Sequence, residues 1–289
     1  MRIRMRSAQD ANFQLSHSYM TLTLTLHTQP AVPLEAEVIT PDNMTGLTAA
    51  QVAALPVMHG NQAAQLGDFF RVEGEANGEV RLVGDLSRIK HIGSGMRGGK
   101  LHIDGDVGMH VGAGMVDGEI VVEGSADDWA GAEMQGGRIT IKGHAGHSLG
   151  SAYRGSSKGM LGGEIIVHGH VGSEAGNSMR RGLIAIGGNT GEFAGVNMLA
   201  GTLLVLGRLG ARAGAGLLRG TLISMEPVQL LPTFIFDCVY QPNYLPLYLR
   251  HARALGLPIH DGFITGAYQR WSGDMVALGR GELLILNRA

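Results

Sequence analysis

Residues 101–143 read LHIDGDVGMHVGAGMVDGEIVVEGSADDWAGAEMQGGRITIKG, and the same short pattern begins three times within them. Along the chain, one series of methionines marks this pattern: Met96, Met115, Met134, Met160, Met179 and Met198, continued by Leu217. The steps are 19, 19, 26, 19, 19 and 19 residues, so the long step is one period plus seven inserted residues. A glycine series from Gly105 to Gly207 has its long step at the same place. Both series are lengthened by the same insertion at the same place. This indicates one structural unit that is repeated and stacked along the chain.

Each unit contains an apolar-x-apolar-x-glycine motif, followed by glycine-rich corners. Alternation with period two and an abundance of β-branched residues are typical of a short strand. Nineteen residues are too few for two packed helices, and so much glycine would destabilise helices. We therefore predict an all-β fold, a right-handed parallel β-helix of about seven 19-residue coils with short mixed α/β caps at both ends. At a strand spacing of ~4.8 Å, seven coils make a column roughly 34 Å long.

The repeat alignment also predicts which side chains face inward. Two series of mainly small apolar residues, beginning at Val107 and Val111, are expected to line the core beside the methionines. The glycine series that begins at Gly112 is expected at corners that need a positive φ. An outward-facing series from His102 to Leu204 is mostly apolar. An apolar stripe of this size is too large to remain exposed to solvent. We expect either the C-terminal segment or another subunit to cover it.

The non-repetitive flanks divide the chain into four parts. Residues 1–19 are expected to be a disordered extension, residues 20–79 an N-terminal cap, residues 80–224 the β-helix, and residues 225–289 a C-terminal helix and strand that pack on the column. In the first cap we predict a strand over 22–26, a turn at 40–43, a helix that begins after the capping box at 48–51, and a hairpin of 70–74 with 80–84. After the repeat, we predict a helix over 244–255 that Gly256 ends, and a strand over 281–286.

Composition excludes several classes of function. A net charge of −2 gives no electrostatic footprint for nucleic acid. The lone cysteine, Cys238, excludes an intramolecular disulfide and a cysteine-rich metal site, and it fits a reducing compartment. No apolar run approaches the ~20 residues of a membrane span. We therefore expect a cytoplasmic protein that binds neither nucleic acid nor membrane.

Two motifs resemble ligand-binding sites, but their context in the repeat argues against that function. Residues 93–98, GSGMRG, match the dinucleotide-binding pattern G-x-G-x-x-G, but a strand rather than a helix follows, and the glycines recur with the repeat. His144 and His170 occupy one series a single coil apart, so both could approach one metal ion. The same series elsewhere carries Asp106, Ser125, Asn189 and Arg208, which is typical of a variable solvent-facing position. We expect no catalytic, cofactor-binding or metal-binding residue in this chain.

Five residues are candidates for contact with a partner protein, because Tyr, Trp and Arg carry much of the binding energy of interfaces. Tyr153 and Arg154 lie in the seven-residue insertion, and Tyr268, Arg270 and Trp271 lie in the C-terminal part. The alternative for Tyr153 and Arg154 is a surface loop without a role. The alternative for Tyr268, Arg270 and Trp271 is local capping of the fold. A free-standing enzyme or binder with a groove along the coils also remains possible, although no outward series shows a row of acidic or aromatic side chains.

The repeated Gly-x-Gly-x-Met and Gly-Gly-x-Ile-x-Ile-x-Gly motifs resemble the β-helical domain that the C subunit of formylmethanofuran dehydrogenase shares with the large subunit of glutamate synthase. Residues 35–42, 67–74, 231–234 and 247–249 point to the formylmethanofuran dehydrogenase branch, and the resemblance spans about residues 20–287.

This resemblance implies a scaffold subunit beside catalytic partners. Low lysine content favours the bacterial formyltransferase/hydrolase complex, which moves formyl from formyl-tetrahydromethanopterin to a methanofuran-type carrier and releases formate. Its partners would be amidohydrolase-like, formyltransferase and dehydrogenase-B-like subunits. The alternative is the C subunit of the redox-active tungsten or molybdenum dehydrogenase.

Overall fold

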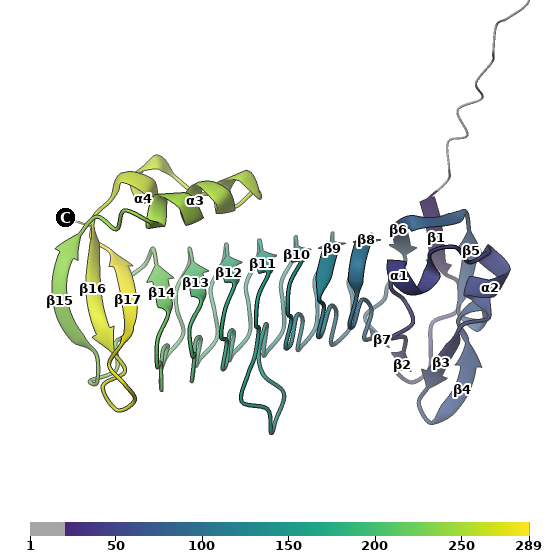
Figure 1. Cartoon of the computed structure of the whole chain (residues 1–289), viewed down its shortest axis with the longest axis horizontal. Coiled ribbons are helices and arrows are strands. Elements are labelled where there is room, and N and C mark those ends of the chain that lie inside the picture. Colours follow the sequence, from purple (N-terminus) through teal and green to yellow (C-terminus); the bar gives the residue numbers. More distant parts are fainter. Residues whose placement is uncertain (1–20, 289) are drawn as a thin grey trace, which may run out of the picture.

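The computed structural model describes residues 21–288, so the expected extension at 1–19 lies outside the described residues. The described chain is organised around one elongated sheet of 13 strands in the order β15-β16-β17-β14-β13-β12-β11-β10-β9-β8-β6-β1-β5. Figure 1 shows this sheet as a row of stacked strands with a small, partly helical unit at the N-terminal end and helices along one side at the C-terminal end. The protein is therefore mostly β with a mainly parallel sheet, as the repeat predicts.

The repeat supplies the seven central strands, and each of them pairs in parallel with the strand on either side. They are β8 (Arg97–Ile103), β9 (Asp117–Val122), β10 (Arg138–Ile141), β11 (Glu164–Val167), β12 (Leu183–Ile186), β13 (Thr202–Val205) and β14 (Thr221–Ser224). Pairing is in register: Ile139 of β10 lies opposite Ile120 on one side and Ile165 on the other. Equivalent residues of successive units are therefore direct neighbours.

A second line of backbone pairing holds the units together away from the long strands. Parallel bridges join Leu86, Val107, Ala126, Ala145, Val171 and Thr190 in succession. These residues belong to the inward series that the sequence predicts, and the members from Val107 to Thr190 are buried. Each unit thus contacts the next through hydrogen bonds on two of its sides.

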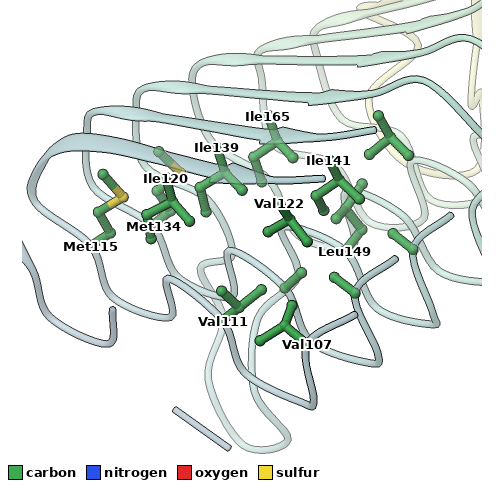
Figure 2. Close-up of a cluster of buried hydrophobic side chains, with 14 of the residues drawn as sticks. Val107, Val111, Met115, Ile120, Val122, Met134, Ile139, Ile141, Leu149 and Ile165 are labelled. Carbon is green, nitrogen blue, oxygen red and sulfur yellow. The ribbon is translucent and has the colours of Figure 1, made fainter. Parts of the chain in front are cut away.

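The core lies inside this stack and consists of repeated apolar columns. All six methionines of the series and Leu217 are fully buried, which confirms their predicted inward position. Ala130, Leu149, Ala175 and Ala194 of the second inward series are buried as well. Figure 2 shows Val107, Val111 and Leu149 facing the strand residues Val122 and Ile141 across the interior, with Met115 and Met134 at one edge.

The corners depend on glycine for two reasons. The predicted glycine series has φ between +62° and +72° from Gly112 to Gly214, in the left-handed region that side chains disfavour. At Gly150 a Cβ atom would also come within 2.7 Å of Ile184 Cδ1 in a neighbouring unit. Backbone conformation and close packing therefore demand the same residue at this corner.

The N-terminal part extends the same sheet and adds a small second one. The strands that extend the large sheet are β1 (Thr21–Leu26), β5 (Phe70–Glu73) and β6 (Glu75–Val83), and the small sheet contains β2 (Leu34–Glu35), β3 (Pro56–His59), β4 (Gln62–Gln65) and β7 (Ile89–Lys90). Helices α1 (Pro41–Met44) and α2 (Ala49–Ala53) and the 3-10 turn η1 (Leu66–Asp68) connect them. The capping box at Thr48 and Gln51 begins α2 as predicted.

Two predictions for this part are wrong. β5 and β6 do not form a hairpin, because β1 lies between them and pairs antiparallel with β5 and parallel with β6. The alternation within β1 directs Leu22 and Leu24 into the core, so this strand buries its apolar face at that place in the sheet. The expected turn at residues 40–43 is the short helix α1, because the Thr40 side chain accepts a hydrogen bond from the Asn43 backbone and caps a first turn that Pro41 favours.

The C-terminal part lengthens the sheet and covers its outer face. It contains β15 (Ile235–Tyr240), α3 (Leu245–Ala254), α4 (Asp261–Thr265), β16 (Tyr268–Gly273) and β17 (Gly281–Leu286). Leu245, Leu249 and Ala252 of α3 pack on the outward apolar series at Ile166 and Leu204. The predicted helix, its end before Gly256, the final strand and the covering of the outward stripe by this segment are all confirmed.

The narrow core leads to a prediction about overpacking. Ala194 is fully buried in a column of small residues, so Ala194→Leu should force its neighbours apart and lower the free energy of unfolding by about 1–3 kcal/mol. The measurement is urea unfolding followed by circular dichroism. Ala63→Leu, at an exposed position of β4, is the matched control and should change little. Equal stability of the two variants would contradict the inward assignment.

Candidate functional site

A groove lies between α3 and the beginnings of strands β11, β12 and β13. It has a volume of about 1160 Å³. Its floor includes Gly137, Gly163, Gly182 and Gly201, so bare backbone is exposed there, and Leu247, Tyr248 and His251 of α3 form one wall. The groove exists because α3 covers the middle of the sheet but not the corners from which the strands start.

Three arginines make this groove positively charged. Arg180, Arg181 and Arg219 line it, and among the described residues none of them lies within 4 Å of an acidic side chain. Arg181 and Arg219 occupy the position two residues after the methionine series, where other units have Gly, Asp or Ala. The groove can attract carboxylate or phosphate groups, but it offers no nucleophile beside a base.

The single acidic residue of the groove is already engaged. Glu164 accepts hydrogen bonds from Arg138 Nε at 2.5 Å and pairs with His251 Nε2 at 2.5 Å. Burial alone would raise the pKa of Glu164, but the hydrogen bonds from His251 and Arg138 outweigh it, so the pKa lies below its ordinary value. This carboxylate, hydrogen-bonded by Arg138 and His251, tethers α3 to β11 and is a poor proton acceptor.

The seven-residue insertion folds back against its own column. The Tyr153 ring stacks on Trp129 with centroids 5.1 Å apart, and its hydroxyl lies 2.9 Å from His110 Nδ1. His110 stacks in turn on His91 at 4.5 Å. Of the two insertion residues expected to contact a partner, Tyr153 is therefore half-buried within this chain and Arg154 is exposed.

His110 and Tyr153 of this aromatic column are uncharged at neutral pH. Burial, with the neighbouring His91, lowers the pKa of His110 to about 4. Burial, with the nearby Glu133 carboxylate, raises the pKa of Tyr153 to about 12. Both shifts arise because burial removes the side chain from water, which disfavours its charged form. The column anchors the insertion rather than supplying an acid or base for catalysis.

The other three candidate contacts have different surroundings. Tyr268 is only 1% exposed, and its hydroxyl donates to the Phe263 carbonyl, so it is a core residue rather than a surface contact. Arg270 pairs with Glu282 at 3.0 Å and with Asp237 at 3.5 Å. Trp271 is half-buried and packs edge-to-face on Phe236 at 5.3 Å. Only the last two reach the surface.

The series that contains His144 and His170 has a shared function that the sequence interpretation missed. Each side chain accepts a hydrogen bond from the backbone N–H of the equivalent residue in the next unit, from Asp106 through Ser125, His144 and His170 to Asn189. The two imidazoles stack with centroids 5.1 Å apart, and each uses Nδ1 as an acceptor. These varied residues all carry a hydrogen-bond acceptor close to the backbone, which was the available signal.

Neither a metal-binding cluster nor a membrane-spanning helix is found in the part of the chain that the structure describes. No three His, Cys, Asp or Glu side chains of residues 21–288 gather closely enough to hold a metal ion. Of the helices in the same range, none has the length and apolarity needed to cross a bilayer. The fold and these surfaces define a repeat-built β protein whose polar side chains serve stacking and contact.

Known proteins show this architecture in a particular setting. A crystal structure of the formyltransferase/hydrolase complex (FhcABCD) from Methylorubrum extorquens, in complex with methylofuran, contains a chain with a TM-score of 0.87 and 33% identity, over 92% of this chain and 100% of that chain. No family model matches the chain.

Curated relatives match over shorter stretches. The C subunit of the molybdenum-containing formylmethanofuran dehydrogenase 1 of Methanothermobacter thermautotrophicus is 44% identical over 80 residues, 27% of this chain and 20% of that protein. The C subunit of the tungsten-containing formylmethanofuran dehydrogenase 2 of Methanothermobacter wolfeii is 42% identical over 93 residues, 30% of this chain and 34% of that protein. The chain thus matches between a fifth and a third of the length of these relatives. It belongs to the family of formylmethanofuran dehydrogenase C subunits.

The aromatic column leads to a prediction about pH. Because the pKa of His110 falls to about 4 in the folded protein, the unfolded chain binds more protons between that value and about 6.5. The stabilisation is therefore complete above pH 6.5 and is lost as the pH falls toward 4. We expect His110→Asn, which tolerates the φ of +68° at this position, to flatten the decline of the melting temperature between pH 7 and pH 4.5.

The control for this experiment is His260→Asn, at an exposed histidine in the C-terminal part. It should leave the pH dependence of the melting temperature as in the unsubstituted protein. Parallel pH profiles for His110→Asn and the unsubstituted protein would show that His110 does not contribute to acid sensitivity.

Proposed function

We propose that this chain is a non-catalytic structural subunit of an enzyme complex that transfers a formyl group from tetrahydromethanopterin to a methanofuran-type carrier and releases formate. The observation that supports it is the end-to-end likeness to a chain of the FhcABCD complex, whose entire length this chain covers. The stack acts as a rigid column of about seven right-handed coils beside amidohydrolase-like, formyltransferase and dehydrogenase-B-like subunits. It works in the cytoplasm and carries no cofactor of its own.

The side chains of the column support a structural role. The carboxylate in the groove is hydrogen-bonded by Arg138 and His251, and the paired histidines accept hydrogen bonds from backbone amides. Ionisable groups that are already satisfied in this way stabilise a surface and are not poised for proton transfer. What remains free is positive charge at Arg180, Arg181 and Arg219, which suits contact with acidic groups.

A second candidate is the C subunit of a redox-active formylmethanofuran dehydrogenase. The relatives named for molybdenum and tungsten enzymes favour it, since they share 44% and 42% identity with this chain in the matched stretches. The two candidates differ in the metal of the whole complex and not in this chain.

The experiment that tests the proposal is affinity purification of this chain from the organism that encodes it. We expect it to bring along the other subunits and formyl-transfer activity with formate release. Molybdenum or tungsten in the purified complex would favour the redox candidate instead. Recovery of the chain alone, under gentle conditions and from the native host, would favour a free-standing binding protein and contradict the proposal.

The isolated chain should have no catalytic activity. Purified alone and supplied with formyl-tetrahydromethanopterin, it should release no formate above the uncatalysed rate, because no nucleophile, acid–base pair or metal cluster is assembled in the described residues. The assay measures formate directly, and the purified complex serves as the positive control. Formate release by the chain alone would contradict the structural role.

The insertion provides a test of assembly. Since Tyr153 anchors the loop, the exposed Arg154 and Lys158 are the residues that it presents to a partner. We expect Arg154→Ala combined with Lys158→Ala to leave thermal unfolding unchanged and to weaken recovery of the other subunits, more strongly at low salt, where the charges are least screened.

The matched control for the insertion is Arg71→Ala, which removes an exposed arginine at the other end of the sheet, on β5. It should not affect assembly. If the double variant co-purifies with its partners at normal stoichiometry and salt resistance, the loop has no role in assembly.

A further inference from the structure

The large sheet ends at β15, and this edge is open. β15 pairs antiparallel with β16 on one side, and it is the terminal strand in the sheet order. Among the described residues, no other segment bonds to its outer edge. Figure 1 shows β15 as the outermost strand at the C-terminal end of the row. A six-residue strand at such a position leaves backbone donors and acceptors directed outward.

The opposite end of the same sheet is protected in the ways that proteins usually protect an edge. β5 is only four residues long, carries the exposed charges of Arg71 and Glu73, and packs against α2. Short length, charge and a covering helix all prevent strand addition. β15 is longer, has one charged residue, Asp237, and lacks a covering helix on this edge in the described chain. The β5 end of the sheet is therefore protected against strand addition, and the β15 end is not.

Apolar side chains are concentrated around the open edge. Of the ten large apolar residues that are exposed in the described chain, six belong to β15 and the adjoining β16–β17 turn: Ile235, Phe236, Val239, Met275, Val276 and Leu278. Val276 is the most exposed of the ten, at 80%. Leu278 lines the groove beside α3, and we call the other five residues the end surface. An exposed apolar patch of this kind marks a contact site rather than a solvated surface.

The turn that presents Val276 is fixed in place. Buried Asp274 accepts hydrogen bonds from the backbone of Val276 and of Gly216, both at 3.0 Å. The Met275 N–H donates to the Thr233 carbonyl at 3.1 Å, which joins the turn to the beginning of β15. A turn held from both sides loses little entropy on binding, so its apolar side chains are preorganised.

The occupant that fits this edge is an extended chain. A row of outward backbone N–H and C=O groups is matched by a strand, and the flanking apolar side chains by alternate side chains of that strand. A shift of register between Phe236 and Cys238 interrupts the row, so the added strand is short and the end surface supplies the remaining contact.

A second copy of this chain is a poorer occupant. Two-fold pairing centred on β15 would bring the two Asp237 carboxylates close together, and like charges on neighbouring strands are destabilising.

We propose that β15 accepts an extended, largely apolar segment of another subunit of the complex, which pairs with its outer edge and covers the end surface. This inference rests on the proposed function, because it takes the occupant from the same assembly.

The direct test is amide hydrogen exchange of β15 in the isolated chain and in the purified complex. The outward amides of residues 235–240 should exchange rapidly in the isolated chain and become strongly protected in the complex. Equal exchange in the two states would overturn the inference. Protection in the isolated chain at low concentration would also overturn it, since the edge would then be covered by this chain itself.

A substitution gives an independent readout. Val239→Lys places a charge on the edge and should weaken association with the other subunits on the order of tenfold, while the isolated chain unfolds normally. Val116→Lys, at an apolar residue that is 42% exposed on the column, is the matched control and should assemble normally. If Val239→Lys assembles as well as Val116→Lys, the open edge is not the contact.

Sedimentation of the isolated chain tests the competing occupant. A dimer that Val239→Lys abolishes would assign the edge to a second copy and contradict the inference. Failure of the unsubstituted chain to co-purify with any subunit would refute the proposed function itself. Normal assembly with unprotected β15 amides would refute this inference alone.

Discussion

In-register stacking of equivalent backbone groups is the constraint on which the rest of the structure depends. Ile120, Ile139 and Ile165 are direct neighbours across three strands, although an insertion separates the last two in sequence. Once this pairing is fixed, every position of the unit forms a column, and each column must satisfy one environment. The methionine, alanine and glycine columns follow from that requirement. So does the series of acceptor side chains, because a side chain that bonds the next backbone N–H is useful in every unit.

Much of the fold could be predicted because the repeat displays each environment several times. One glycine or methionine says little, whereas Met96 through Met198 at a constant period identify a buried column. The end of α3 and the strand β17 were also accessible, since Gly256 and the alternation at 281–286 are local signals. The order of β5, β1 and β6 was not accessible. It depends on which of several apolar strands buries most surface, and this is decided by partners distant in sequence.

The candidate surfaces were harder to predict for the same reason. Tyr153 has the residue type of an interface anchor, but its ring stacks on Trp129 of an earlier unit. Tyr268 has the same chemistry and lies in the core under α4. Exposure decides whether such a side chain meets solvent, a partner or its own chain, and exposure is a property of packing. The arginines of the groove left a sequence signal, since they replace Gly, Asp or Ala within a column, but the groove forms only when α3 is in place.

A stack of equal units also fixes length. Each added or deleted unit would move β15 relative to β1 by one strand spacing, ~4.8 Å, and by no intermediate amount. The two ends of the sheet therefore stand at a separation that changes only in whole steps, whereas surface residues along the column can vary freely. Substitutions at either end therefore leave this distance unchanged, and a change in it requires the gain or loss of an entire unit.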